Sequence, residues 1–123
     1  MAFYPPCPVL RIFDEAKARD HYLGFLGFKV VFEHRFEPGT PIYMGISRDA
    51  CVLHLSEHHG DGSPGANVRI RMDELDAYCA VLNASGYKYY RPAITTTDWN
   101  TREMTIADGF GNRLNFYEDV PRS

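Results

Sequence analysis

The sequence lacks the features that mark nucleic-acid-binding, membrane and secreted proteins. It has no cluster of Lys and Arg, and its formal net charge is −3, so nucleic acid is not an expected partner. No apolar run approaches the about 18 residues that a membrane-spanning helix needs, so we expect no membrane segment. The opening stretch MAFYPPCPVL lacks the basic start and the apolar run of a signal peptide, so we expect none.

Cysteine is also scarce. The chain has only Cys7, Cys51 and Cys79, which are far apart and form no CxxC pair. An odd number of widely spaced cysteines argues against a disulfide framework and suits a reducing compartment. The sequence therefore predicts a cytoplasmic protein.

What is present is enough for one folded domain. Hydrophobic residues make up 45% of the 123 residues, which predicts a globular chain with a core of its own. The segment HHGDGSPG, residues 58–65, is rich in turn-forming residues and divides the chain into two similar halves. We predict a single domain over 1–123, with a first repeat at about 7–57, a linker at 58–65 and a second repeat at about 66–119.

Each half shows the same order of expected elements. The first half is expected to form a strand at 8–13, a helix at 14–27, and strands at 28–36, 42–48 and 51–57. The second half is expected to form a strand at 66–72, a helix at 73–86, an irregular strand at 87–100, and a hairpin at 101–108 and 113–118. In the first helix, Ala18, Tyr22, Phe25 and Leu26 share one face, and Asp14 is the expected N-cap.

The repeat is visible in the residues themselves. DEAKARDHYLGFLGFKVV and DELDAYCAVLNASGYKYY share their acidic start, an alanine, a leucine and a Gly-aromatic-Lys ending. LHLSE (53–57) corresponds to LNFYE (114–118), which places His54 and Asn115 at equivalent positions. A βαβββ unit cannot bury its sheet alone. The predicted fold class is therefore α+β, with two βαβββ repeats pairing their sheets around a groove.

Three segments resemble one known superfamily. FDEAKARDHYLGFLGF resembles the opening of vicinal-oxygen-chelate domains, the superfamily of glyoxalase I, extradiol dioxygenases and bleomycin-resistance proteins. WNTREMTIADGFGN is similar to its Trp-Gly-x-Arg-Glu and Asp-Pro-x-Gly-Asn motifs, except that Asn100 replaces the glycine and Gly109 the proline. LHLSEHHGDGSPG resembles the bleomycin-resistance-like subgroup. The resemblance spans about 8–118 and implies the glyoxalase/bleomycin-resistance-like fold.

The resemblance also implies where a metal would bind. Metal-using members carry His, Glu or Gln at four inward strand positions, which correspond here to Cys7, His54, Asn67 and Asn115. Only His54 is a routine ligand, since a neutral amide brings no charge to a divalent ion. We therefore expect no cofactor and no metal. One divalent metal ion, held by an enzyme of the glyoxalase-like lyase or dioxygenase type, is the open alternative.

Without a metal, the resemblance implies binding without catalysis. Bleomycin-resistance proteins are homodimers that sequester an antibiotic in a groove between subunits, so the predicted ligand is a small molecule such as a cationic glycopeptide antibiotic. A housekeeping binder of another metabolite fits the sequence equally well. We name no catalytic residue.

Trp99 is the leading candidate for ligand contact. It stands between the polar stretches TTTD and NTRE, so its ring is expected to be exposed and free to stack on a ligand, or else to fill a dimer interface. Arg102 and Glu103 follow, and they either pair with neighbouring side chains or anchor a polar ligand. Glu57 is expected at the groove rim with Phe36 and Tyr43. The predicted ligand-binding residues are Trp99, His54, Asn115, Arg102, Phe36, Tyr43 and Glu57.

Overall fold

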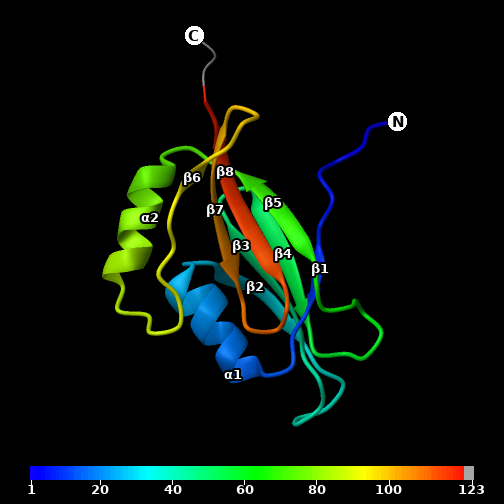
Figure 1. Ribbon diagram of the computed structural model, residues 1–123. Helices are drawn as coiled ribbons and strands as arrows, with labels where there is room; N and C mark the ends of the chain where they lie inside the picture. Colours follow the sequence, from blue (N-terminus) through cyan, green and yellow to red (C-terminus); the bar gives the residue numbers. More distant parts are fainter. Residues whose placement is uncertain (121–123) are drawn as a thin grey trace. The chain divides into compact units, whose positions relative to one another are not determined.

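The computed structural model describes residues 1–120 and divides into two compact units, Met1–Pro64 and the chain from Gly65 on (Figure 1). The boundary falls within the segment 58–65. Each unit contains one helical segment and one mixed four-stranded sheet, which confirms the predicted pair of βαβββ repeats. The pairing of the two sheets around a groove stays a prediction. None of the helices in the described part of the chain is long and apolar enough to cross a membrane.

The two units have the same topology. The first consists of β1 (Val9–Arg11), α1 (Glu15–Ala18), the π-helix η1 (Arg19–Phe25), β2 (Lys29–His34), β3 (Tyr43–Arg48) and β4 (Cys51–Ser56), with strand order β1-β4-β3-β2. The second consists of β5 (Asn67–Arg71), α2 (Leu75–Ala84), β6 (Thr95–Thr96), β7 (Thr101–Ala107) and β8 (Arg113–Asp119), with strand order β5-β8-β7-β6. In each sheet the first strand runs parallel to the last and the other pairs are antiparallel.

The first helix begins as the sequence predicts. The Asp14 side chain accepts a hydrogen bond from the Lys17 backbone N–H at 2.9 Å, which satisfies one of the free donors of the first turn. The helix then widens, and the Leu26 N–H bonds the carbonyl of His21, five residues back. All four predicted core residues of this segment are buried, so the predicted apolar face is confirmed: Ala18, Tyr22, Phe25 and Leu26.

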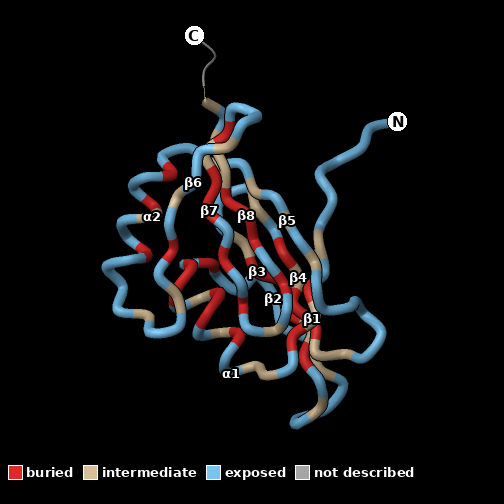
Figure 2. Tube along the Cα trace, in the orientation of Figure 1, coloured by how far each residue is buried: buried red, intermediate tan, exposed pale blue. Residues whose placement is uncertain are grey.

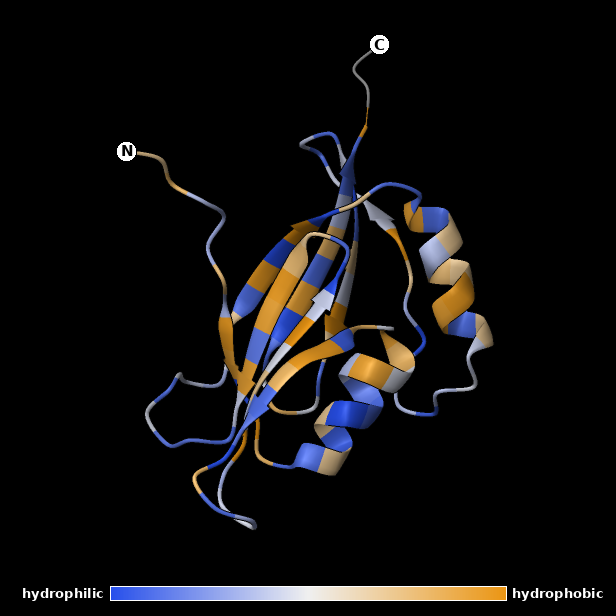
Figure 3. Ribbon diagram, turned by 180° about the vertical axis from the view of Figure 1, so that it is seen from behind, coloured by the Kyte–Doolittle hydropathy of each residue, from blue (hydrophilic) through white to orange (hydrophobic). Residues whose placement is uncertain are grey.

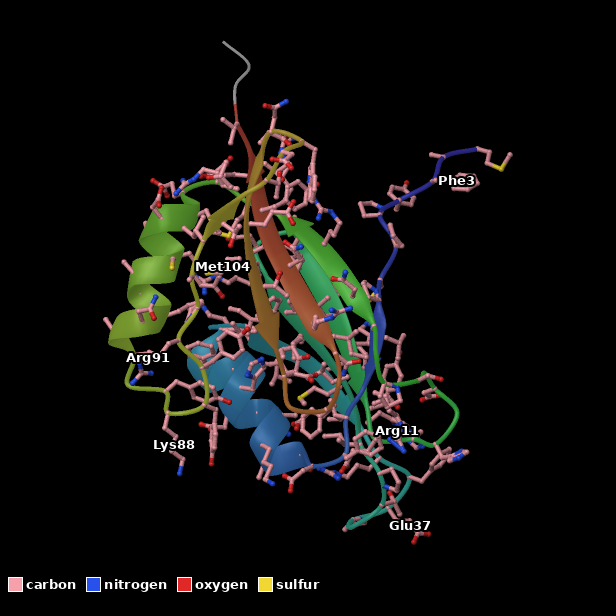
Figure 4. The ribbon with its side chains drawn as sticks, viewed as in Figure 1. Phe3, Arg11, Glu37, Lys88, Arg91 and Met104 are labelled. Carbon is pink, nitrogen blue, oxygen red and sulfur yellow. The ribbon has the colours of Figure 1, made fainter. Side chains whose placement is uncertain are left out.

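Both sheets have one apolar face packed against their own helix. Buried residues lie on β1, β3, β4, β7 and β8, apolar and polar residues alternate along β5, and β2 is exposed along its whole length (Figures 2 and 3). On β8, Leu114 and Phe116 are buried, and the Phe116 ring lies edge-on to Tyr78 of α2 at 5.4 Å. Met104 of β7, labelled in Figure 4, pairs with Phe116 and is fully buried on the same side. The candidate residues that alternate with these buried side chains, Asn115 among them, therefore project from the opposite face.

The sequence-based prediction of a strand is wrong for residues 87–94 and 97–100. An irregular strand was expected over 87–100, but only the two-residue β6 forms there. Pro92 has no N–H to give to a sheet, and its carbonyl accepts a hydrogen bond from the Asn83 side chain of α2 at 2.9 Å. The Tyr90 hydroxyl donates to the carbonyl of Thr105 at 2.8 Å. Side chains hold this segment beside β7 in place of a ladder.

The two departures from the superfamily motifs have a backbone explanation. Gly109 has a φ of +83°, which proline cannot adopt, so the turn between β7 and β8 differs from one built on Asp-Pro. The Asp108 carboxylate closes this turn by accepting the Phe110 N–H at 2.7 Å. Asn100 has a φ of 63°, in the left-handed region that glycine adopts readily and asparagine tolerates. Asn100 thus adopts a left-handed backbone conformation that the motif glycine could also adopt.

Candidate functional site

Strand register places the two units' central residues at matching points. His54 of β4 lies opposite Val9 of β1, and Asn115 of β8 lies opposite Arg69 of β5. Two residues before these partners stand Cys7 and Asn67, both exposed. The equivalence of His54 and Asn115 that the repeat suggested is therefore also an equivalence of strand pairing.

In the second unit, the polar groups converge on Glu103 of β7. Its Oε1 accepts hydrogen bonds from Asn115 Nδ2 at 2.8 Å and from Arg69 at 3.2 Å. Its Oε2 accepts from the Thr101 hydroxyl at 2.5 Å, the Trp99 indole N–H at 3.1 Å and the second Arg69 nitrogen at 3.3 Å. A carboxylate offers about four lone-pair positions, so Glu103 has no acceptor capacity left. We call these five residues the Glu103 cluster.

The Glu103 cluster fixes the charge of its central carboxylate. The Arg69 guanidinium, followed by the Thr101 hydroxyl, lowers the pKa of Glu103 to about 2, and the loss of hydration on burial opposes this only partly. Arg69 also lies over the ring of Tyr117, with its guanidinium carbon 4.3 Å from the ring centroid. Glu103 is therefore ionised and paired at neutral pH.

Asn115 owes its orientation to this carboxylate. Ionised Glu103 can only accept, so the Asn115 amide must present its N–H group there, and its Oδ1 points away. That oxygen is buried and has no hydrogen-bond partner among the described residues. Asn115 thus occupies a superfamily ligand position but acts as a donor to Glu103.

The side chain of Trp99 is exposed as predicted, but a hydrogen bond fixes its position. Its side chain is 64% exposed while its indole N–H is fixed on Glu103. The turn that carries it is closed by Thr97, whose N–H donates to the carbonyl of Thr101 at 2.8 Å. The ring is therefore held at one end and open to solvent on its apolar surface.

Arg102 does not lie on the same face of the sheet as Trp99 and its partner Glu103. It lies on the opposite face of β7, the face toward α2, and donates to Asp76 at 2.6 and 2.8 Å and to Glu118 at 2.8 Å. Glu118 also accepts the N–H of Leu75 at the start of α2. The structure therefore places Arg102 in a network that ties the helix to the sheet.

Replacing Arg102 by alanine should lower the melting temperature without changing the surroundings of Trp99. The ion pair with Asp76 is exposed and the one with Glu118 is half-buried, so the loss should be smaller than that for a change at the buried Glu103. Thermal melts together with the fluorescence spectrum of Trp99 check this. A shifted Trp99 spectrum with unchanged stability would contradict the assignment.

The predicted ligand-binding residues include neither Glu103, the centre of the cluster, nor Arg69 and Thr101. The alternation of buried Met104 and Ile106 places Arg102 on the core side of β7 and Glu103 on the other side, so the period-two pattern of the sequence already separated these two residues.

Glu57 and Phe36, both in the first unit, do not contribute to the Glu103 cluster. Glu57 accepts the backbone N–H of Ile42 at 3.1 Å, and Phe36 is 81% exposed beside the ring of His34.

In the first unit, three rings meet on the face of the sheet opposite its core. The Tyr43 hydroxyl lies 2.8 Å from His54 Nδ1, and the His54 ring is edge-on to both Phe32 and Tyr43, at 5.2 and 5.3 Å. Between them, Gly45 leaves room for Phe32, because a Cβ there would lie 2.3 Å from its ring. Burial raises the pKa of Tyr43, so its phenol stays protonated.

The donor set at the four superfamily positions does not fit a divalent metal. Only His54 offers a routine ligand atom, its Nε2, because its Nδ1 is bonded to Tyr43, and Asn115 turns its amide N–H group toward Glu103. Cys7 is exposed, but a partial loss of hydration at its sulfur raises the pKa of the thiol, which disfavours the thiolate that a metal needs. Among residues 1–120, no group of three or more His, Cys, Asp and Glu side chains is placed to hold a metal ion.

Comparison with known proteins identifies the family. A family model described as glyoxalase superfamily protein matches residues 1–122. None of the curated proteins matches the chain by sequence.

Solved structures share the fold at low sequence identity. A bleomycin-binding protein complexed with bleomycin is 21% identical with a TM-score of 0.71, over 95% of this chain and 99% of that one. A bleomycin resistance determinant encoded on the transposon Tn5 is 21% identical with a TM-score of 0.73, over 95% and 98%. An antibiotic binding protein from Streptomyces sp. CB03234 is 19% identical with a TM-score of 0.68, over 98% and 99%. With a family model matching nearly its whole length, this chain belongs to the glyoxalase superfamily.

Proposed function

We propose that this protein captures a small molecule with a flat ring system by stacking it on Trp99, without chemical conversion. The observation that carries the proposal is the state of Trp99: its ring is 64% exposed while its N–H is anchored to a buried carboxylate. A fixed, exposed aromatic surface loses little conformational entropy when a ligand stacks on it.

The electrostatics of the Glu103 cluster narrow the mode of binding. Glu103 is saturated by its own neighbours, and Arg69 balances its charge. An ion pair between Glu103 and a ligand cation would have to displace Arg69. We therefore assign the main contact to stacking on Trp99, with any cationic tail of the ligand held by the net charge of −3.

Antibiotics of the bleomycin type are the first ligands to test. The related bleomycin-binding protein and the antibiotic binding protein from Streptomyces sp. CB03234 support this choice. The donor set that does not fit a metal supports binding over a metal-dependent lyase or dioxygenase reaction.

We also propose that the binding form is a homodimer. The first unit exposes Val9, Val31, Phe32 and Val52, each at 36% or more, and exposed apolar side chains of this kind gain from burial against a second chain. Sedimentation at micromolar concentration should give about 28 kDa, twice the 14.0 kDa of one chain. A sedimenting species of one chain at that concentration would contradict the dimer.

Titration with metal-free bleomycin and phleomycin tests the proposal. Trp99 is the sole tryptophan, so its fluorescence reports directly on the site. We expect saturable quenching at micromolar ligand, and a Kd at least about tenfold higher by calorimetry for Trp99→Ala, equivalent to about 1.4 kcal/mol.

Tyr89→Ala is the matched control. Tyr89 is as exposed as Trp99, at 66%, and lies in the same unit with its ring against Tyr87. It should leave the Kd unchanged. Absence of quenching by either antibiotic in a folded protein, or an equal loss of affinity in both variants, would argue against stacking on Trp99.

A further inference from the structure

The segment that follows α2 is positively charged on a chain that is acidic as a whole. From Ala77 to Thr97 the sequence has no Asp or Glu, whereas Lys88 and Arg91 both lie in the run YKYYR, residues 87–91. The formal net charge of the chain is −3. Figure 4 shows Lys88 and Arg91 on the segment that leaves α2. We call residues 87–91 the YKYYR loop.

The YKYYR loop is held in one shape by its own contacts. Gly86, with a φ of +79°, turns the chain out of α2. Arg91 Nη1 then donates to the carbonyls of Tyr87 at 2.5 Å and of Tyr90 at 3.3 Å. The Tyr90 hydroxyl ties the loop to the carbonyl of Thr105. A partner that binds these side chains therefore has little loop motion to suppress.

The exposed part of the YKYYR loop combines an aromatic ring with unpaired positive charge. Tyr89 is 66% exposed, with its ring edge-on to Tyr87 at 5.4 Å, and Lys88 Nζ lies 5.0 Å from the Tyr89 ring centroid. Neither Lys88 nor Arg91 forms an ion pair with a carboxylate in the described residues 1–120. Tyrosine and arginine are also the residue types most enriched at the centres of protein–protein interfaces.

Stabilisation of the helix end does not account for these contacts. Cations near a helix C-terminus interact favourably with its dipole. Arg91, however, bonds carbonyls of the loop beyond α2, and Lys88 lies against a ring. The positive charge is therefore available to a partner from outside the unit.

The number of charges selects the class of partner. Nucleic acids bind through many phosphate contacts, and anionic membranes attract clusters of about four to eight Lys and Arg side chains. Two cations on a chain of net charge −3 are too few for either polyanion. A short acidic segment of a protein needs only local charge complementarity.

We propose that the YKYYR loop is a docking surface for an acidic segment of a partner protein. Carboxylates of that segment pair with Lys88 and Arg91, and an apolar side chain between them packs on Tyr89. The proposal does not depend on capture of a small molecule at Trp99.

The test is a ¹H–¹⁵N NMR titration with the capped peptide Glu-Glu-Phe-Glu-Glu. The amide signals of residues 87–91 should move saturably, and the Trp99 indole N–H signal should stay in place. The Kd should rise at least about tenfold between about 50 and 500 mM salt, because salt screens exposed charges. The capped peptide Gln-Gln-Phe-Gln-Gln has the same length without the charge and should not bind. Equal binding of the two peptides would overturn the proposal.

Variants identify the contacts. Lys88→Glu should weaken binding of the acidic peptide at least about tenfold, because attraction becomes repulsion. Lys17→Glu, the same change at an exposed lysine of the first unit, should leave the Kd unchanged. Tyr89→Ala should weaken the peptide but not the antibiotic, so this proposal and the one at Trp99 fail separately.

Two further probes test the class of partner. Oligothymidylate represents nucleic acid, and phosphatidylserine vesicles represent an anionic membrane. Tighter binding of either probe than of the acidic peptide would overturn the proposal, as would equal losses in Lys88→Glu and Lys17→Glu.

Discussion

Replacing Glu103 by glutamine is expected to lower the free energy of unfolding by about 2–3 kcal/mol, because hydrogen bonds to a charged group contribute about 1.5–3 kcal/mol each. The amide has nearly the shape of the carboxylate, but one of its two ends now donates. That end faces N–H or O–H donors whichever way the amide turns, since Asn115 and Arg69 occupy one side and Trp99 and Thr101 the other. Arg69 also loses its counter-charge. Urea unfolding at pH 7 measures the loss.

The same variant should bind the ligand less well and respond differently to acid. With the indole N–H no longer anchored, Trp99 is free to move, and we expect about a tenfold rise in the Kd for bleomycin.

The pKa of Glu103 in the folded protein is about 2, below the ordinary value of 4.5, so between these two pH values the unfolded chain binds more protons than the folded one. Its contribution to stability is present above pH 4.5 and is lost as the pH falls toward 2. The stability gap between wild type and Glu103→Gln should therefore narrow over that window.

Glu57→Gln is the matched control for the loss of a carboxylate. Glu57 accepts one backbone hydrogen bond, from Ile42, and an amide oxygen can replace it. We expect a loss below about 1 kcal/mol and no change in Trp99. Equal losses for the two variants, or a gap that stays constant down to pH 2, would show that the Glu103 cluster does not organise this face.

Replacing Gly45 by alanine is expected to destabilise the first unit by about 1–3 kcal/mol, the usual cost of overpacking. The new Cβ would lie 2.3 Å from Cε1 and 2.7 Å from Cδ1 of Phe32, so the ring must leave its place. That movement breaks the edge-on contact of Phe32 with His54 and its stacking on Tyr43. The effect outweighs the gain of about 0.5–1 kcal/mol that alanine ordinarily brings in place of a strand glycine.

A double-mutant cycle with Phe32→Ala isolates the clash. Removing the ring first should make Gly45→Ala neutral or stabilising, with an interaction energy of at least about 1 kcal/mol. Gly24→Ala is the control, because a Cβ there meets nothing closer than 3.6 Å. Additive effects of the two changes would mean that Phe32 does not need the space above Gly45.

The sequence predicted the order of elements well because each rests on local signals. Asp14 as N-cap and the buried helix face need only the 3.6-residue period, and the strands need only alternation. The expected strand at 87–94 failed because the segment is held by side chains of Asn83 and Tyr90, contacts that no local pattern shows.

The site could be predicted only in part. The exposure of Trp99 follows from its polar neighbours, and the match of His54 with Asn115 follows from the repeat. The role of Glu103 depends on three strands in register, since Arg69 and Asn115 lie 34 and 12 residues from it along the chain. Arg102 and Glu103 lie on opposite faces of β7, but which of them joins the cluster around Trp99 can be told only when the neighbouring strands are known.

The most direct test of capture without a metal is the metal content of wild-type protein purified without chelator, measured by mass spectrometry beside His54→Ala. The account predicts far less than one equivalent of nickel, zinc, iron or manganese per chain, at the same level in both proteins, in samples that still bind the antibiotic. About one equivalent in the wild type that disappears in His54→Ala would contradict it.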